Sequence, residues 1–163
     1  MVLLSSALPA AAMVGGAEVV RGTGPGRHIV IVVGTRGSFC TGTALARDLV
    51  LTAGHCVAPA ASYRVVLPGM KPPGLVTKSI SVHPRYNRKD YLAGHVTADV
   101  ALIKLEQPLP DEVVPAPLAP TASVEAGDRL VIAGFGTTAA SSTEDIGIGV
   151  ARAATLVATR QPG

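Results

Sequence analysis

The sequence predicts an all-β protein, a small antiparallel barrel or sandwich. Three observations lead to this prediction. The apolar runs are short and rich in β-branched residues, no stretch has the pattern of an amphipathic helix, and 18 glycines and 13 prolines are spread between the runs. Six strands are expected within about eighty residues, an arrangement typical of small antiparallel barrels, at 28–33, 39–45, 49–53, 63–67, 75–82 and 100–105.

The individual runs support this assignment in order. The first, 28–33, is an almost unbroken series of Ile and Val, and the next three are similarly short and apolar. The fifth, 75–82, partly alternates between apolar and polar residues, as a half-buried strand does. The sixth, 100–105, is apolar except for one lysine. Gly, Pro, Asn or Asp residues separate most of these runs, so each is expected to end in a turn.

A proline-rich stretch follows the expected barrel. Residues 107–120 contain five prolines and are expected to form a linker over a surface. Two further strands are expected beyond it, at 129–133 and 149–157. Two strands alone do not form a stable sheet, so they are expected to begin a second domain whose remainder is missing.

The overall composition limits the possible functions. Apolar residues make up 48% of the chain and charged residues 15%, a balance that excludes a charged disordered protein. The net charge is +3 with scattered basic residues, and the aromatic side chains are three tyrosines and two phenylalanines. A basic surface with stacking aromatics for nucleic acid is therefore not expected.

The N-terminal residues 1–12 have the character of a signal peptide. They are apolar and uncharged, and Ala10-Ala11-Ala12 matches the small-x-small pattern of a cleavage site. An ordinary flexible terminus is the alternative. The segment is too short to span a bilayer well, so the mature protein is expected to be secreted or periplasmic, with no membrane contact after leader removal.

The chain has two cysteines, Cys40 and Cys56. In an exported protein such a pair is normally a disulfide, and two free thiols are the alternative. His55 lies next to Cys56 in sequence, which is poor geometry for two ligands of one ion. No metal site is therefore expected.

The most distinctive stretch is Phe-Cys-Thr-Gly-Thr-Ala-Leu at 39–45 followed by Leu-Val-Leu-Thr-Ala-Gly-His-Cys at 49–56. It resembles the chymotrypsin/trypsin family of serine endopeptidases. The resemblance implies a trypsin-like antiparallel six-stranded Greek-key barrel, in which His55 is the catalytic base. It also implies that the disulfide Cys40–Cys56 closes beside that histidine.

A second stretch, Ala-Asp-Val-Ala-Leu-Ile-Lys-Leu at 98–105, resembles the strand that carries the family's catalytic aspartate. The resemblance implies that Asp99 accepts the Nδ1 proton of His55 and stabilises the imidazolium. Asp90 is the nearby rival, in a stretch expected to be a polar loop. Triad chemistry implies no cofactor.

Three weaker matches occur in the family's order. Met13-Val14-Gly15-Gly16 resembles the mature N-terminus, which puts Met13 directly after the expected cleavage site. Val-His-Pro-Arg-Tyr-Asn at 82–87 resembles the loop ahead of the aspartate, so His83 is expected to be a loop residue. Gly-Phe-Gly at 134–136 resembles the strand that opens the second barrel. His28 and His95 lie in no motif and are expected on the surface or in strands.

The family's nucleophile sequence is absent, since neither Gly-Asp-Ser nor Ser-Gly-Gly occurs, and Ser141 and Ser142 lie in a polar loop without the required glycines. The leading interpretation is a truncated serine endopeptidase, inactive alone, with residues 13–112 as the first barrel and 113–163 as linker and incomplete second barrel. The complete enzyme is expected to be a monomer that cleaves proteins or peptides, with a specificity the sequence does not define. The alternative is a non-catalytic binding protein on a protease-like scaffold.

Overall fold

The structure, a computed structural model, describes residues 17–19, 22–58, 61–71, 73–119, 124–135 and 150–159. Several features expected from the sequence lie outside these residues: the leader 1–12, the stretch 13–16 that begins with Met13, Gly136, Ser141, Ser142 and the first residue of the expected strand 149–157.

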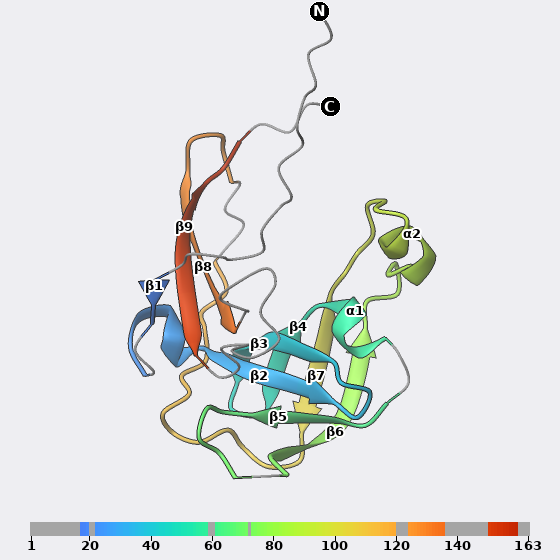
Figure 1. Ribbon diagram of the computed structural model, residues 1–163, viewed down its shortest axis with the longest axis vertical. Coiled ribbons are helices and arrows are strands. Elements are labelled where there is room, and N and C mark those ends of the chain that lie inside the picture. The colour runs from blue at the N-terminus through green and yellow to red at the C-terminus, as the bar shows by residue number, and fades with distance from the viewer. Residues whose placement is uncertain are drawn as a thin grey trace, which may run out of the picture.

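The main body is a closed antiparallel barrel of six strands, drawn in the lower part of Figure 1. Its order is β2-β3-β4-β7-β6-β5, and β5 closes the barrel by pairing with β2. Strand β7 lies beside β4 although β5 and β6 separate them in the chain, which is a Greek-key connection. The predicted six-stranded barrel is therefore confirmed. Its strands are β2 (Ile29–Gly34), β3 (Phe39–Ala46), β4 (Leu49–Thr52), β5 (Tyr63–Val66), β6 (Leu75–Val82) and β7 (Ala101–Leu105).

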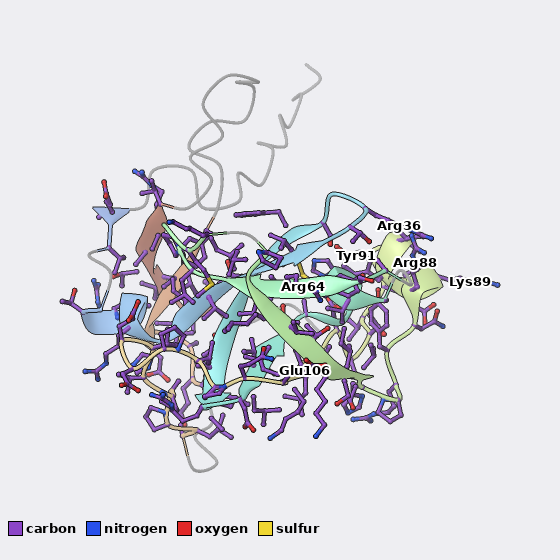
Figure 2. All side chains as sticks on the ribbon, turned by 90° about the horizontal axis from the view of Figure 1, so that it is seen from below. Arg36, Arg64, Arg88, Lys89, Tyr91 and Glu106 are labelled. Carbon is purple, nitrogen blue, oxygen red and sulfur yellow. A yellow bond between two sulfur atoms is a disulfide. The ribbon has the colours of Figure 1, made fainter. Side chains whose placement is uncertain are left out.

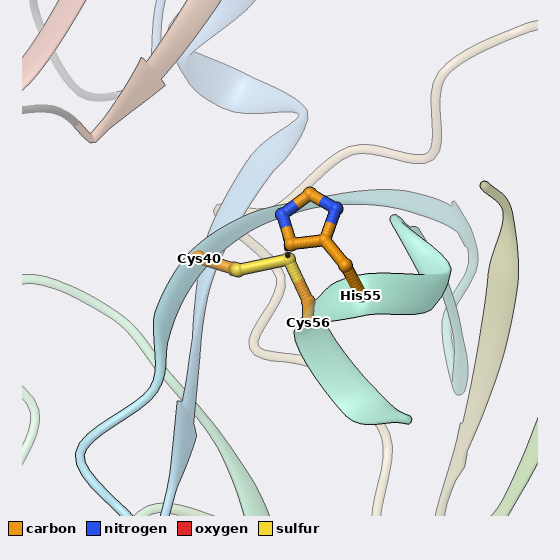
Figure 3. Close-up of side chains that lie close together, drawn as sticks. All are labelled: Cys40, His55 and Cys56. Carbon is orange, nitrogen blue, oxygen red and sulfur yellow. Dashed lines mark hydrogen bonds between the residues drawn. A yellow bond between two sulfur atoms is a disulfide. The ribbon is translucent and has the colours of Figure 1, made fainter. Parts of the chain in front are cut away.

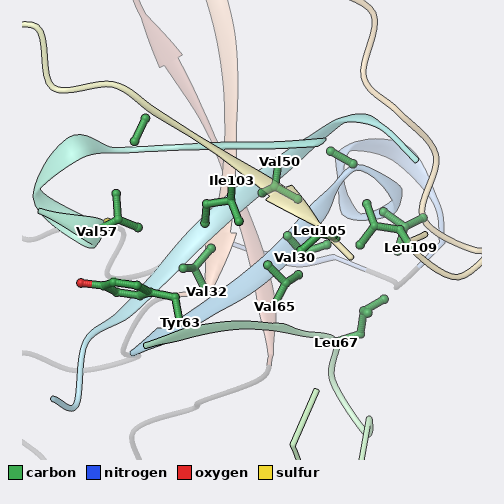
Figure 4. Close-up of a cluster of buried hydrophobic side chains, with 14 residues drawn as sticks. Val30, Val32, Val50, Val57, Tyr63, Val65, Leu67, Ile103, Leu105 and Leu109 are labelled. Carbon is green, nitrogen blue, oxygen red and sulfur yellow. The ribbon is translucent and has the colours of Figure 1, made fainter. Parts of the chain in front are cut away.

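The side chains of β2 point alternately to two buried clusters, which explains why its sequence is apolar without interruption. Val30 and Val32 are buried in the barrel interior, whereas Ile29 and Ile31 belong to a second buried cluster outside it. Because successive side chains of a strand point to opposite faces, a strand with two buried faces must be apolar at every position. Figure 4 shows the interior cluster, which Tyr63, Val65 and Ile103 also fill.

The proline-rich stretch contributes to the barrel core, which differs from the predicted surface linker. Leu109 is fully buried and Val113 is 3% exposed, and both pack in the interior cluster. Backbone bonds hold the stretch in place: the amides of Leu109 and Ala116 donate to the carbonyls of Arg47 and Ala44. The composition of the stretch suggested a linker, but its few apolar side chains fill the end of the barrel.

A second sheet lies against the barrel (Figure 1), with the order β1-β9-β8. Strands β8 (Arg129–Phe135) and β9 (Ala151–Val157) were expected, whereas β1 (Ala17–Glu18) was not. Phe135 and Ala151 pack with Ile29 and Ile31 between the sheet and the barrel. The Phe135 amide also donates to Thr41 Oγ1 at 2.9 Å, so the junction is both apolar and hydrogen-bonded.

In the described part of the chain, three short helical segments connect the strands: the 3-10 turn η1 (Gly24–Arg27), α1 (Gly54–Val57) and α2 (Arg88–Leu92). The last replaces the polar loop expected around Asp90. Its amides at Lys89 and Asp90 donate to the Asn87 side chain, a standard N-cap. None of the helices in the described ranges is long and apolar enough to cross a membrane.

The barrel core predicts a strong difference between two isoleucine substitutions. Ile103→Ala removes a fully buried side chain, whereas Ile132→Ala changes one that is 38% exposed on β8. We expect the first to lower the free energy of unfolding by about 2–5 kcal/mol and the second by less than about 1 kcal/mol. Urea denaturation measures both, and equal losses would show that the barrel interior is not the stabilising core.

Candidate functional site

Strand register brings His55 and Asp99 together. Strands β4 and β7 are antiparallel neighbours, and Thr52 at the end of β4 pairs with Ala101 at the start of β7. His55 follows Thr52 by three residues, and Asp99 precedes Ala101 by two. Both residues therefore leave the same end of the barrel from adjacent strands. The buried Thr52 supports this end by donating from Oγ1 to the Thr41 carbonyl at 3.0 Å.

The Asp99 carboxylate bonds to two different parts of His55. Oδ2 lies 2.6 Å from the ring Nδ1, and Oδ1 accepts from the His55 backbone amide at 2.7 Å. Since an ionised carboxylate only accepts, Nδ1 must carry the proton. The neutral ring then has its free lone pair on Nε2, ready to accept a proton. One carboxylate thus sets the position of the backbone, the orientation of the ring and the tautomer.

The electrostatics of Asp99 favour its charged form. Partial burial raises the pKa of the carboxyl, but the hydrogen bonds from the His55 ring and amide outweigh burial, so the pKa lies below the ordinary Asp value. Nearby, burial and then the Asp99 charge raise the pKa of the Tyr86 phenol, which therefore stays protonated. The site presents an ionised carboxylate to a ring that can become cationic.

Gly54 permits the close packing around this carboxylate. A Cβ built at Gly54 would lie 3.1 Å from both Asp99 Oδ1 and the Tyr86 ring. These are tight contacts, so a larger side chain would require Asp99 or Tyr86 to move. The glycine of the Thr-Ala-Gly-His-Cys sequence therefore matters for the approach of Asp99 to the His55 amide.

The disulfide Cys40–Cys56 joins β3 to α1 directly beside His55, as Figure 3 shows. The Cys56 sulfur lies 3.5 Å from His55 Nε2. A disulfide sulfur has no proton to donate, so this contact leaves the Nε2 lone pair available. In the described ranges Cys40, His55 and Cys56 form the one close group of metal-type donors. Both sulfurs are bonded to each other and offer no thiolate for a metal.

Tyr91 of α2 is a neighbour of His55 that sequence reasoning missed. Its ring stacks on the imidazole with centroids 4.6 Å apart and planes inclined by 10°. The ring of Tyr86 lies 6.4 Å from that of Tyr91, centroid to centroid, in a tilted arrangement. Tyr91 lies in no family motif, and only the position of α2 relative to His55 reveals the contact.

The other histidines and the rival aspartate lie apart from this pair. His83 follows β6 in a turn, as expected, and its Nδ1 accepts from the Arg85 amide. Asp90 Oδ1 in α2 lies 3.9 Å from Nδ1 of His95, which follows that helix. His28 bonds through Nδ1 to the Val114 carbonyl. None of these contacts involves His55 or Asp99.

The lowered pKa of Asp99 predicts a pH-dependent contribution to stability. Because the folded-state pKa lies below the unfolded value of about 3.9, the ionised carboxylate stabilises the fold fully above that pH. The contribution is lost as the pH falls through the lowered folded-state pKa. We expect Asp99→Asn to remove this part of the acid sensitivity, measured by urea unfolding between pH 7 and pH 2.

Asp90→Asn is the matched control, since it also removes one negative charge but no contact with His55. If Asp99→Asn and the parent chain lost stability in parallel below pH 4, the hydrogen bonds to His55 would not be what lowers the pKa of Asp99.

Comparison with known proteins gives a consistent result. The family model described as Trypsin matches residues 13–150. Chymotrypsin-like elastase family member 1 of Rattus norvegicus is 36% identical over 108 residues, which are 60% of this chain and 39% of the relative. Chymotrypsin-like elastase family member 3B of Homo sapiens is 36% identical over 103 residues, 54% of this chain and 37% of the relative. The chain thus spans less than two fifths of these curated relatives.

A solved structure described as "Structure of GrC" has the same fold. It superposes with a TM-score of 0.70 at 22% identity, over 91% of this chain and 66% of that one. Since the family model covers most of the sequence, including His55 and Asp99, the chain belongs to the trypsin family.

Proposed function

We propose that this chain supplies the general base and the orienting carboxylate of a serine endopeptidase. The observation that carries the proposal is the two-point bonding of Asp99 to the ring and the amide of His55. A strand-capping aspartate needs a backbone partner only. The second bond, to Nδ1, is the one that prepares Nε2 for proton transfer.

In the proposed reaction His55 Nε2 takes the proton of a serine hydroxyl while the serine oxygen attacks the peptide carbonyl. His55 then passes that proton to the leaving amine. In the second half of the reaction His55 takes a proton from water as the water attacks the acyl-enzyme, and returns it to the serine oxygen as the acid product leaves. Asp99 remains ionised throughout and stabilises the imidazolium. The nucleophilic serine is proposed to lie in sequence outside these 163 residues, because they contain no Gly-Asp-Ser-Gly-Gly-Pro segment.

The proposed substrates are proteins or peptides, and the proposed enzyme is an exported monomer. Export is supported by the disulfide, which persists in oxidising compartments, and by the apolar, uncharged residues 1–12. Met13 is the proposed mature N-terminus. Specificity within this class depends on residues outside the chain.

The first test uses the chain as it stands. Without a nucleophile, the 163-residue polypeptide is expected to release no product above background from a mixture of chromogenic peptide substrates. Product release that a serine-directed covalent inhibitor blocks would contradict this expectation and require a serine within the present sequence.

The second test uses the product of the whole gene, read beyond the codon of Gly163. A downstream Gly-Asp-Ser-Gly-Gly-Pro sequence and peptidase activity are expected. His55→Ala should lower kcat by a factor on the order of 10⁴–10⁶. His28→Ala should leave kcat unchanged, since the His28 ring bonds to Arg27 and to the Val114 carbonyl. A folded whole-gene product without activity, or with activity that survives His55→Ala, would favour a binding protein or another site.

A further inference from the structure

The face of the His55 ring is covered by an aromatic side chain from a separate segment. Tyr91 lies on α2, which Figure 2 shows with Tyr91 near Arg88 and Lys89. The 10° inclination and 4.6 Å separation make this a parallel stack over the imidazole. Tyr91 is 38% exposed and the His55 side chain 37%, so the stack lies at the surface and is open to solvent on its rim.

The segment that carries Tyr91 is held by its own hydrogen bonds. The Asn87 side chain accepts from the amides of Lys89 and Asp90 at the start of α2. The Asn87 amide donates to Thr97 Oγ1 at 2.7 Å, and Thr97 Oγ1 donates to the Arg85 carbonyl at 3.1 Å. Thr97 therefore ties the two ends of the segment together. Tyr91 is presented to His55 by this framework and does not depend on the stack alone for its position.

Three contacts now restrict the imidazole. Asp99 holds the Nδ1 edge, the Cys56 sulfur lies against Nε2, and Tyr91 covers one face. Rotation of the ring about its Cβ–Cγ bond would break the bond to Asp99 and tilt the ring out of the stack at the same time. A stacked aromatic also attracts a cationic ring through its negative face, and such contacts lie within about 6 Å of the ring centroid.

We propose that Tyr91 is a positioning residue for His55: it holds the imidazole in the plane of Asp99 and stabilises the imidazolium by stacking. This inference rests on the proposed function only for its catalytic consequence. When His55 has taken a proton, the new positive charge is spread over the ring that faces Tyr91. The aromatic ring, and not the phenol hydroxyl, provides the effect, so phenylalanine should replace tyrosine.

The test measures the His55 ring directly in the 163-residue chain. With ¹³C- and ¹⁵N-labelled histidine, four ring systems are observed, and His55→Ala identifies the one of interest. The ring current of Tyr91 should shift the ¹H resonances of the His55 ring away from their ordinary chemical shifts. In Tyr91→Ala this ring-current shift should disappear. Exchange of the imidazolium Nδ1 proton with water should accelerate about threefold to thirtyfold, the range expected for losing a cation–π contact.

Two control variants separate positioning from general stability. Tyr91→Phe keeps the stacking ring and should retain both the ring-current shift of the His55 resonances and the slow exchange of the Nδ1 proton. Leu92→Ala alters the next residue of the same helix, which is 70% exposed, and should change neither. Slow Nδ1 exchange that survives in a folded Tyr91→Ala variant would overturn the proposal. So would fast exchange in Tyr91→Phe, because the hydroxyl would then be responsible.

A kinetic measurement on the whole-gene product extends the test. Tyr91→Ala should lower kcat by about threefold to thirtyfold, and Tyr91→Phe should restore it. If the whole-gene product has no peptidase activity but the exchange results hold, the proposed function fails and the positioning role stands. If activity is present and exchange is unaffected by Tyr91→Ala, only the positioning role fails.

Discussion

The arrangement of the site depends on one carboxylate that binds both the backbone and the side chain of the same residue. Asp99 accepts from the His55 amide and from its ring nitrogen. The first bond joins α1 to the segment before β7, and the second fixes the tautomer of the ring. This pair of hydrogen bonds depends on the β4–β7 register and on the absence of a side chain at Gly54. The disulfide Cys40–Cys56 also ties α1 to β3. A shift of one residue in the β4–β7 register would displace Asp99, which precedes β7 by two residues, relative to α1, which follows β4.

Sequence reasoning predicted the parts of this molecule that are encoded locally. The strands follow from short β-branched runs, and the His55 and Asp99 sequences are distinctive enough to be recognised in isolation. The burial of Leu109 and Val113 was missed because a proline-rich composition resembles a linker whether or not its apolar residues fill a cavity. Tyr91 was missed because its partner lies thirty-six positions away and no sequence periodicity connects them.

The junction between the barrel and the second sheet explains another sequence feature. Thr41 Oγ1 receives the Phe135 amide, and a Cβ built at Gly134 would lie 2.9 Å from that oxygen. The Gly-Phe pair therefore combines a residue small enough to approach β3 with an aromatic ring large enough to fill the space beside Ile29 and Ile31. The backbone carbonyl of the same Thr41 accepts a hydrogen bond from Oγ1 of Thr52, which lies three residues before His55. Hydrogen bonds thus connect the second sheet through Thr41 to Thr52 at the end of β4.

The pairing of β1 with β9 has a consequence for the order of folding. Ala17 pairs with Ala153, so among the described residues the first strand pairs with the last. During synthesis β1 leaves the ribosome long before its partner exists, since Ala17 and Ala153 are 153 − 17 = 136 positions apart. The most distant pairing in the barrel, Leu49 with Lys104, spans 104 − 49 = 55 positions. Pairings between distant residues form slowly because a long loop must close first. The barrel that carries His55 and Asp99 is therefore expected to assemble before the N-terminal segment finds its place.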